Sequence, residues 1–117
     1  MDALAGLERD AWQVLTDEPA AARSFYENVL HDRVVVLLID RTPIQERETA
    51  LAALCGARWT AHSLADLSAA RLSSRVGAVN YRVAAIKDGI PYSARVSSVY
   101  VHRDDGWKLT FHQHVSW

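Results

Sequence analysis

The second half of the chain is dominated by segments in which apolar and polar residues alternate, separated by short turns that contain aspartate and glycine. Four segments show this pattern: residues 59–67, 76–87, 91–103 and 107–115. Alternation with a period of two is typical of strands that bury one face. Asp-Gly at 88–89 and Asp-Asp-Gly at 104–106 predict hairpin turns, because glycine adopts positive φ at low cost. The sequence therefore predicts a four-stranded antiparallel meander.

The first half of the chain predicts three helices and one buried strand. Apolar residues recur at helical spacing over residues 4–15 and 19–30, and Glu8 falls among the polar residues of the first of these helices. The β-branched run at 33–40 is typical of a strand covered on both faces. A third helix is expected over residues 46–55. This order of elements predicts an α+β fold, with three N-terminal helices packed on a mainly antiparallel sheet.

Composition limits the classes of partner. The chain has 117 residues and 50% of them are apolar, enough for one core, so we expect residues 1–117 to form a single domain. The formal net charge of −1 predicts no nucleic-acid-binding surface and no membrane-binding surface. Cys55 is the only cysteine, which favours a reducing, cytoplasmic location. The N-terminus does not resemble a signal peptide, and the longest apolar run, residues 34–39, is too short to span a bilayer.

The alternation also assigns side chains to the two faces of the sheet. A two-residue turn at 88–89 places Tyr81 opposite Val96 and Ala85 opposite Tyr92. One face then carries Val79, Tyr81, Val83, Tyr92, Val96, Ser98 and Tyr100. The other face carries Asn80, Arg82, Ser93, Arg95 and Ser97. We expect the helices to cover the first, more apolar face.

The register of the last hairpin is open in the sequence. A two-residue turn at Asp105-Gly106 points every second residue of 107–113 toward the helices, including Leu109 and Gln113. A three-residue loop with a bulge would point His112 and His114 there instead, since a slip of one residue exchanges the two faces. We prefer the two-residue turn because it buries Leu109. It places both histidines on the outer face.

The predicted order of elements resembles the nuclear transport factor two-like superfamily, the cone-shaped fold of ketosteroid isomerase and polyketide cyclases. The segment VSSVYVHRDDGWKLTFHQHVSW is similar to the last hairpin of that family, including the calcium/calmodulin-dependent kinase association domain. AWQVL, SFYENVL and QERETALAAL lie where small bacterial members of unassigned function have helices. The resemblance implies a strongly curved sheet around a central cavity, and an outer face that pairs with a second subunit.

Six residues are candidates to bind a ligand in such a cavity: Tyr26, Trp59, Tyr81, Tyr92, Tyr100 and Gln113. Tyrosine hydroxyls would donate to a ligand carbonyl, and the rings would suit an apolar or aromatic small molecule. The alternative is that the tyrosines are ordinary core residues whose hydroxyls bond the backbone. An inward amide at Gln113 needs a partner, which a ligand, a water or a tyrosine would provide.

Asp40 is the candidate catalytic residue. It follows the first predicted strand, and the resemblance implies a general base in a comparable place in ketosteroid isomerase. A carboxylate beside an apolar cavity would have a raised pKa and could move a proton. The alternative is a surface aspartate that pairs with Arg41.

The sequence predicts neither a metal nor a cofactor. His112 and His114 could supply two imidazoles to a zinc ion, but the pattern places no third ligand, and His102 lies about four residues away at ~3.4 Å each along the ladder. Phosphate-binding loops, dinucleotide fingerprints and nucleophile elbows are not found in the sequence.

Three functions follow as hypotheses. The first is a homodimeric protein that binds an apolar or aromatic small molecule. The second is a cofactor-independent isomerase, cyclase or dehydratase with Asp40 as base and Tyr26 or Tyr81 polarising a carbonyl. The third is a dimerisation unit. In the first and third, the outer face forms the contact with a second copy through Arg82, Arg95, His112 and His114.

Overall fold

The computed structural model of the protein describes residues 2–117. Its elements, in chain order, are α1 (Asp2–Leu15), α2 (Pro19–Val29), β1 (Leu30–Leu37), α3 (Arg47–Cys55), β2 (Trp59–Ser73), β3 (Val76–Lys87), β4 (Ile90–Arg103) and β5 (Gly106–Ser116). The strands form one sheet in the order β1-β5-β4-β3-β2, in which β1 runs parallel to β5 and the other neighbours are antiparallel. The predicted α+β fold is confirmed.

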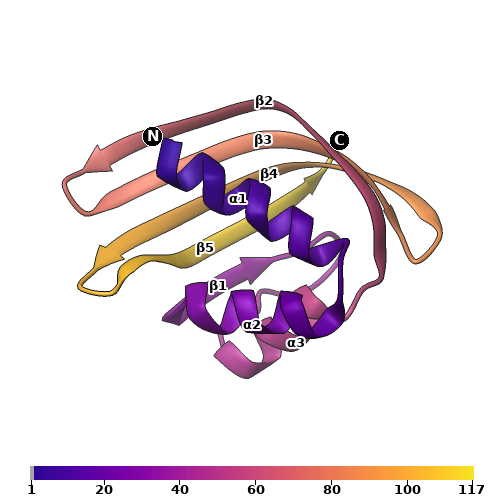
Figure 1. Cartoon of the computed structure of the whole chain (residues 1–117), viewed down its shortest axis with the longest axis horizontal. Helices are drawn as coiled ribbons and strands as arrows, with labels where there is room; N and C mark the ends of the chain where they lie inside the picture. The colour runs from indigo at the N-terminus through magenta and orange to yellow at the C-terminus, as the bar shows by residue number, and fades with distance from the viewer. Residues whose placement is uncertain (1) are drawn as a thin grey trace.

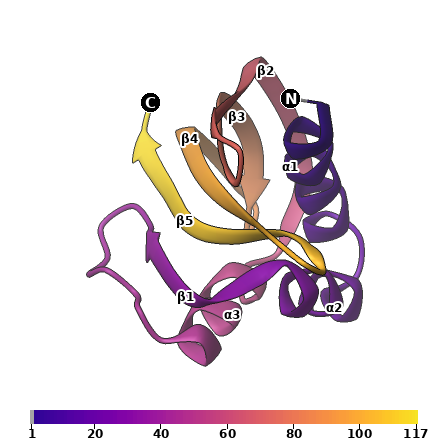
Figure 2. The ribbon, with the colours of Figure 1, turned by 90° about the vertical axis from the view of Figure 1, so that its left-hand side faces the viewer.

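The sheet curls around the helices, so that it has a concave and a convex face. Helix α1 lies across the concave face of β2 to β5, and α2 and α3 lie near β1 (Figure 1). The curl is clearest when the sheet is seen along its strands (Figure 2). The main core fills the concave side: α1 contributes Leu4 and Trp12, α3 contributes Leu51, and β3 contributes Tyr81 and Val83. None of the helices within residues 2–117 is long and apolar enough to cross a membrane.

The hairpin between β3 and β4 has the predicted register. Asp88 and Gly89 both have positive φ, 51° and 80°, which is the signature of the tight turn that matches strand twist. Tyr81 pairs with Val96 and Ala85 pairs with Tyr92, as expected. The face assignment of these two strands is therefore confirmed.

Two strand boundaries differ from the prediction. Strand β1 covers Leu30–Leu37 rather than residues 33–40, and β2 continues to Ser73 rather than stopping near residue 67. In β2 the pairing with β3 is irregular between Ala65 and Ser68, and Asp66 has a φ of 58°. This bulge interrupts the alternation, so the second half of the strand does not look like a continuation of the first.

The last hairpin differs from the prediction in the position of its turn and in the faces of the residues beyond Leu109. The turn occupies residues 104–105, one position earlier than expected, and Tyr100 pairs with Leu109. The next pair joins Val99 to Phe111, so Thr110 is an extra, unpaired residue and forms a β-bulge. Its hydroxyl donates to the carbonyl of Arg33 in β1 at 2.7 Å. The bulge reverses the faces of every later residue in β5.

The predicted outer position of the two histidines is consequently wrong. His112 and His114 lie on the concave face with only 4% and 8% of their surface exposed. Gln113 was expected on the inside, but it pairs with Ser97 on the convex side. Arg82 and Arg95 pair with each other in the ladder and lie on the convex side, as predicted.

Candidate functional site

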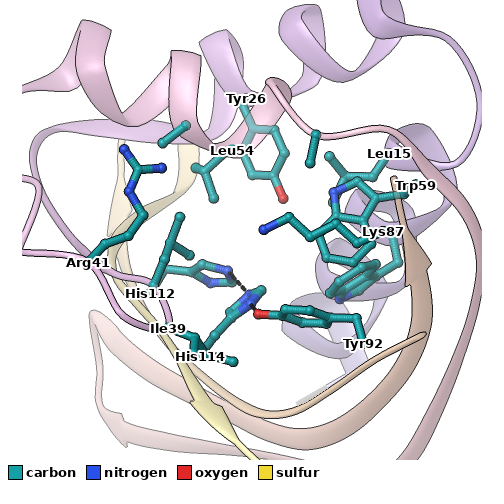
Figure 3. Close-up of a pocket in the computed structure, with 14 residues that line it drawn as sticks. Leu15, Tyr26, Ile39, Arg41, Leu54, Trp59, Lys87, Tyr92, His112 and His114 are labelled. Atoms are coloured by element: carbon teal, nitrogen blue, oxygen red, sulfur yellow. Dashed lines mark hydrogen bonds between the residues drawn. The ribbon is translucent and has the colours of Figure 1, made fainter. Parts of the chain in front are cut away.

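A pocket opens between the helices and the concave face, close to the end of β5. Its volume is about 50 Å³. The side chains that line it come from all three helices, the loop after β1 and four strands (Figure 3): Trp12, Leu15, Tyr26, Leu38, Ile39, Arg41, Ala53, Leu54, Ala57, Trp59, Lys87, Tyr92, His112 and His114. The pocket is small and mostly apolar, with a few polar groups directed into it.

Aromatic rings form one wall of the pocket. The centroids of Trp12 and Trp59 are 4.9 Å apart at 83°, and those of Trp59 and Tyr92 are 5.0 Å apart at 84°. His114 stacks on Trp12, with ring centroids 6.1 Å apart and an interplanar angle of 24°. Edge-to-face contacts of this kind fix ring orientations, so the wall is preorganised.

Three polar groups of the pocket, Lys87, Tyr26 and Arg41, are donors or cations. The Lys87 ammonium lies 5.7 Å from the Trp59 ring centroid and 5.4 Å from that of Tyr92, in cation–π geometry. The Tyr26 hydroxyl points into the pocket (Figure 3), and burial together with the charge of Glu8 raises the pKa of Tyr26. Arg41 stands at the side of the pocket (Figure 3). Among the described residues, no aspartate or glutamate belongs to the lining.

The two histidines contact each other at the base of the pocket. His112 Nε2 lies 3.0 Å from His114 Nε2, and His114 Nδ1 lies 2.7 Å from the Tyr92 hydroxyl. Burial lowers the pKa of His112, and burial together with the charges of His112 and Lys87 lowers the pKa of His114. Both imidazoles are therefore neutral at pH 7, each with one donor and one acceptor nitrogen.

A buried carboxylate lies behind the histidine pair. Glu8 is 1% exposed, and its Oε1 accepts hydrogen bonds from the Tyr81 hydroxyl at 2.6 Å and the Ser98 hydroxyl at 3.1 Å. The Tyr100 hydroxyl donates to Oε2. Trp12 Nε1 donates to the Tyr81 oxygen at 2.7 Å. The hydroxyl hydrogen of Tyr81 is therefore free to donate to the Glu8 carboxylate. The Glu8 carboxylate thus accepts three hydrogen bonds, all of them from neutral hydroxyls.

Sequence reasoning missed Glu8 because a glutamate in an amphipathic helix is usually solvated. The signal was its spacing: Leu4, Glu8 and Trp12 are separated by four residues each and lie on the same side of α1. All three are buried. A polar residue inside an apolar stripe needs a partner, and here the partners are hydroxyls from β3 and β4.

The structure brings three of the six predicted ligand-binding residues together. Tyr26, Trp59 and Tyr92 line the pocket. Tyr81 and Tyr100 are fully buried behind it and donate to Glu8, so they are core residues with a side-chain partner rather than the backbone partner that was expected as the alternative. Gln113 is outside the pocket, because the Thr110 bulge turns it to the other face.

The structure does not place Asp40 in the pocket. Its neighbours Ile39 and Arg41 belong to the lining, whereas Asp40 is exposed and has a φ of 58° in the turn after β1. Aspartate tolerates this left-handed conformation better than most residues, which gives it a local role in the turn.

No group of three histidine, cysteine, aspartate or glutamate side chains within residues 2–117 is arranged to hold a metal ion. The histidine pair is instead occupied by hydrogen bonds to Tyr92 and Ser98.

The sequence matches no protein-family model, and no match is found among curated proteins. The structure is similar to a nuclear transport factor two-like protein from Cytophaga hutchinsonii, with a TM-score of 0.84 and 16% identity over 99% of this chain and 97% of that one. It is similar to a protein with a cystatin-like fold from Caulobacter vibrioides, with a TM-score of 0.81 and 11% identity over 99% and 88% of the two chains. A candidate ketosteroid isomerase from Parabacteroides distasonis gives a TM-score of 0.76 and 13% identity over 97% and 85%.

Proposed function

We propose that this chain, which has the nuclear transport factor two-like fold, is a small-molecule-binding protein whose ligand occupies the pocket described above. The observation that carries the proposal is the unpartnered Tyr26 hydroxyl. It is directed into an aromatic pocket beside Lys87 (Figure 3), and no hydrogen bond joins it to another residue among 2–117. The hydroxyl faces the space of the pocket rather than the packed core, so its hydrogen is available to an acceptor on a ligand.

The lining also describes the ligand. Trp59 and Tyr92 suit a flat apolar body, in agreement with the apolar or aromatic ligand expected from the sequence. Lys87 and Tyr26 favour an electron-rich or negatively charged group at one end. The volume of about 50 Å³ limits the ligand to a few non-hydrogen atoms, unless the flexible Lys87 side chain turns out of the pocket.

A matched pair of variants tests this proposal. Ala53 lines the pocket and Ala52 is exposed on the same helix, so Ala53→Phe fills the pocket and Ala52→Phe does not. Ligand-observed NMR with acetate, acetamide, phenol and benzoate is expected to show binding of at least one probe to the natural protein and to Ala52→Phe. That binding is expected to be lost in Ala53→Phe. If none of the four probes binds, or if Ala53→Phe binds them equally well, the proposal is wrong.

A second candidate is cofactor-independent acid–base catalysis of the isomerase, cyclase or dehydratase kind. It is favoured by the presence of two imidazoles in the lining. Because Asp40 is exposed, the histidine pair is better placed than Asp40 to exchange a proton with a bound molecule. Asp40→Asn is therefore expected to leave probe binding, and any turnover found for a bound compound, unchanged. A loss of turnover in Asp40→Asn would restore the aspartate as the base.

We also propose that two copies associate through the convex face. The Trp117 ring centroid lies 5.1 Å from the guanidinium carbon of Arg82 and 4.4 Å from that of Arg95, yet 59% of the residue stays exposed. Val115, next to it on β5, is 50% exposed. Sedimentation equilibrium at micromolar concentration is expected to give twice the chain mass, and Trp117→Ser to weaken the association. A monomer throughout would contradict this part.

A further inference from the structure

A continuous chain of hydrogen bonds connects the pocket to the buried carboxylate. It starts at the Tyr92 hydroxyl, 2.7 Å from His114 Nδ1, and passes through the 3.0 Å contact between the Nε2 atoms of the two histidines. It continues from His112 Nδ1 to the Ser98 hydroxyl at 2.7 Å and from there to Glu8 Oε1 at 3.1 Å. Tyr92, His114 and His112 line the pocket, and Glu8 is buried on the inner side of α1.

With the Glu8 carboxylate accepting from Ser98 and both imidazoles neutral, only one arrangement of protons satisfies this chain of hydrogen bonds. Ser98 has one hydroxyl hydrogen and donates it to the carboxylate, so its oxygen accepts from His112 Nδ1–H. The other nitrogen of His112 is then bare and accepts from His114 Nε2–H. His114 Nδ1 is bare in turn and accepts the hydroxyl hydrogen of Tyr92. The chain is thus polarised from the pocket toward Glu8.

The charge balance of this chain of hydrogen bonds favours the uptake of one proton. None of the ion pairs among residues 2–117 includes Glu8, so its charge is held by neutral donors alone. A buried carboxylate without a cation is costly, and a positive charge in the same network would offset it. Of the imidazole nitrogens, His114 Nδ1 can accept this proton most directly, because only one other hydrogen, that of the Tyr92 hydroxyl, has to move. This nitrogen lies on the pocket side of the chain.

We propose that the pocket binds a small carboxylate together with one proton taken from water, an inference that rests on the pocket being the ligand site. Tyr92 turns its hydroxyl hydrogen from His114 to the bound carboxylate. A solvent proton then forms an N–H bond at His114 Nδ1, which donates to the Tyr92 oxygen. The protein gains one positive charge and the ligand brings one negative charge, so the pair is neutral. Lys87 provides a second positive group for the carboxylate.

The groups that face His114 explain why the proton arrives only with the ligand. Burial of His114 opposes an imidazolium most strongly, and the neighbouring His112 and Lys87 from β3 act in the same direction. Arg41, from the loop after β1, is a further cation in the lining. Glu8 from α1 favours a positive charge on His112, the next ring in the network, and Tyr26 from α2 and Tyr92 from β4 are neutral hydroxyls. In the lining, α3 and β2 contribute apolar side chains alone. A bound carboxylate offsets Lys87 and shifts this balance toward the charged imidazole.

Acetate and its neutral isostere acetamide test the proposal. Between pH 7 and 8, where acetate is fully ionised, its dissociation constant is expected to rise about tenfold per pH unit, since one proton is linked to binding. Calorimetry in two buffers of different ionisation enthalpy is expected to give uptake of about one proton per acetate. Acetamide is expected to bind weakly and without proton uptake.

Glu8→Gln tests proton uptake separately from ligand binding, because it removes the buried charge of Glu8 and leaves Lys87 in place. Acetate is expected to bind this variant with little pH dependence. Should Glu8→Gln not fold, Ser98→Ala is the second variant for the same measurement, because it breaks the chain of hydrogen bonds without removing the charge of Glu8. Acetate binding that is independent of pH in the natural protein overturns this inference but leaves the proposed function standing. If neither acetate nor any larger probe binds, both fail.

Discussion

The two faces of the sheet carry polar clusters in very different surroundings. On the concave face, Glu8 and the histidine pair are buried and bonded to neutral hydroxyls. On the convex face, Arg82 pairs with Asp66 at 2.8 Å, with 38% and 66% of the two side chains exposed. Hydrogen bonds and charges are worth more, and cost more when broken, where water is excluded. The concave cluster should therefore determine stability and chemistry, and the convex cluster should contribute little.

The largest effect is expected from removing the buried acceptor. Glu8→Ala leaves the hydroxyls of Tyr81, Ser98 and Tyr100 without their partner, which should lower the free energy of unfolding by about 2–4 kcal/mol. Asp10→Ala, on the exposed side of the same helix, is the matched control and should change it by less than about 0.5 kcal/mol. Urea denaturation measures both. Equal effects of the two substitutions would mean that Glu8 is not bonded as described.

Acid should destabilise the protein through the same cluster. The pKa values of His112 and His114 lie below the ordinary 6.5 in the folded state, so below that pH the unfolded chain binds more protons than the folded one. Stability is therefore complete above pH 6.5 and falls as the pH is lowered, by up to about 1.4 kcal/mol per pH unit for each histidine.

Urea midpoints between pH 5 and 8 measure this slope. His114→Gln should flatten it, whereas His102→Gln, at an exposed site, should leave it unchanged. A natural protein whose stability does not fall below pH 6.5 would show that the imidazoles are solvated.

A smaller effect is expected at the bulge that separates the two faces of β5. Thr110→Val keeps the shape of the side chain but removes its hydrogen bond to the carbonyl of Arg33, at a cost of about 1 kcal/mol. The NMR signals of His112 and His114 should shift as well, since the bulge orients them. Unchanged signals and stability would indicate that the register does not depend on this contact.

The smallest effect is expected on the convex face. Asp66→Asn breaks the exposed pair with Arg82 and should cost between about 0 and 1 kcal/mol, with less loss in 1 M salt because exposed charges are screened. Thermal melts at two salt concentrations measure it. A loss as large as that of Glu8→Ala would remove the distinction between the two faces.

The sequence predicts the elements that depend on local chemistry. Asp88-Gly89 determines its own turn, and the register of β3 and β4 follows from it. The position of the Thr110 bulge could not be predicted, because it is stabilised by Arg33 in a strand far away in the sequence. Because of this one extra residue, His112 and His114 point into the interior and Gln113 does not. Tyr26 and Trp59 are predicted from residue type, and Tyr92 also from its face of the sheet, whereas Glu8 depends on partners more than 70 residues away.

The protonation pattern of the two imidazoles in the free protein tests the central claim most directly. Long-range ¹H–¹⁵N NMR at pH 7 should show His114 protonated at Nε2 and His112 protonated at Nδ1, with neither ring titrating near the ordinary 6.5. The reverse tautomers, or two histidines that titrate as solvent-exposed imidazoles, would contradict the buried network that links the pocket to Glu8.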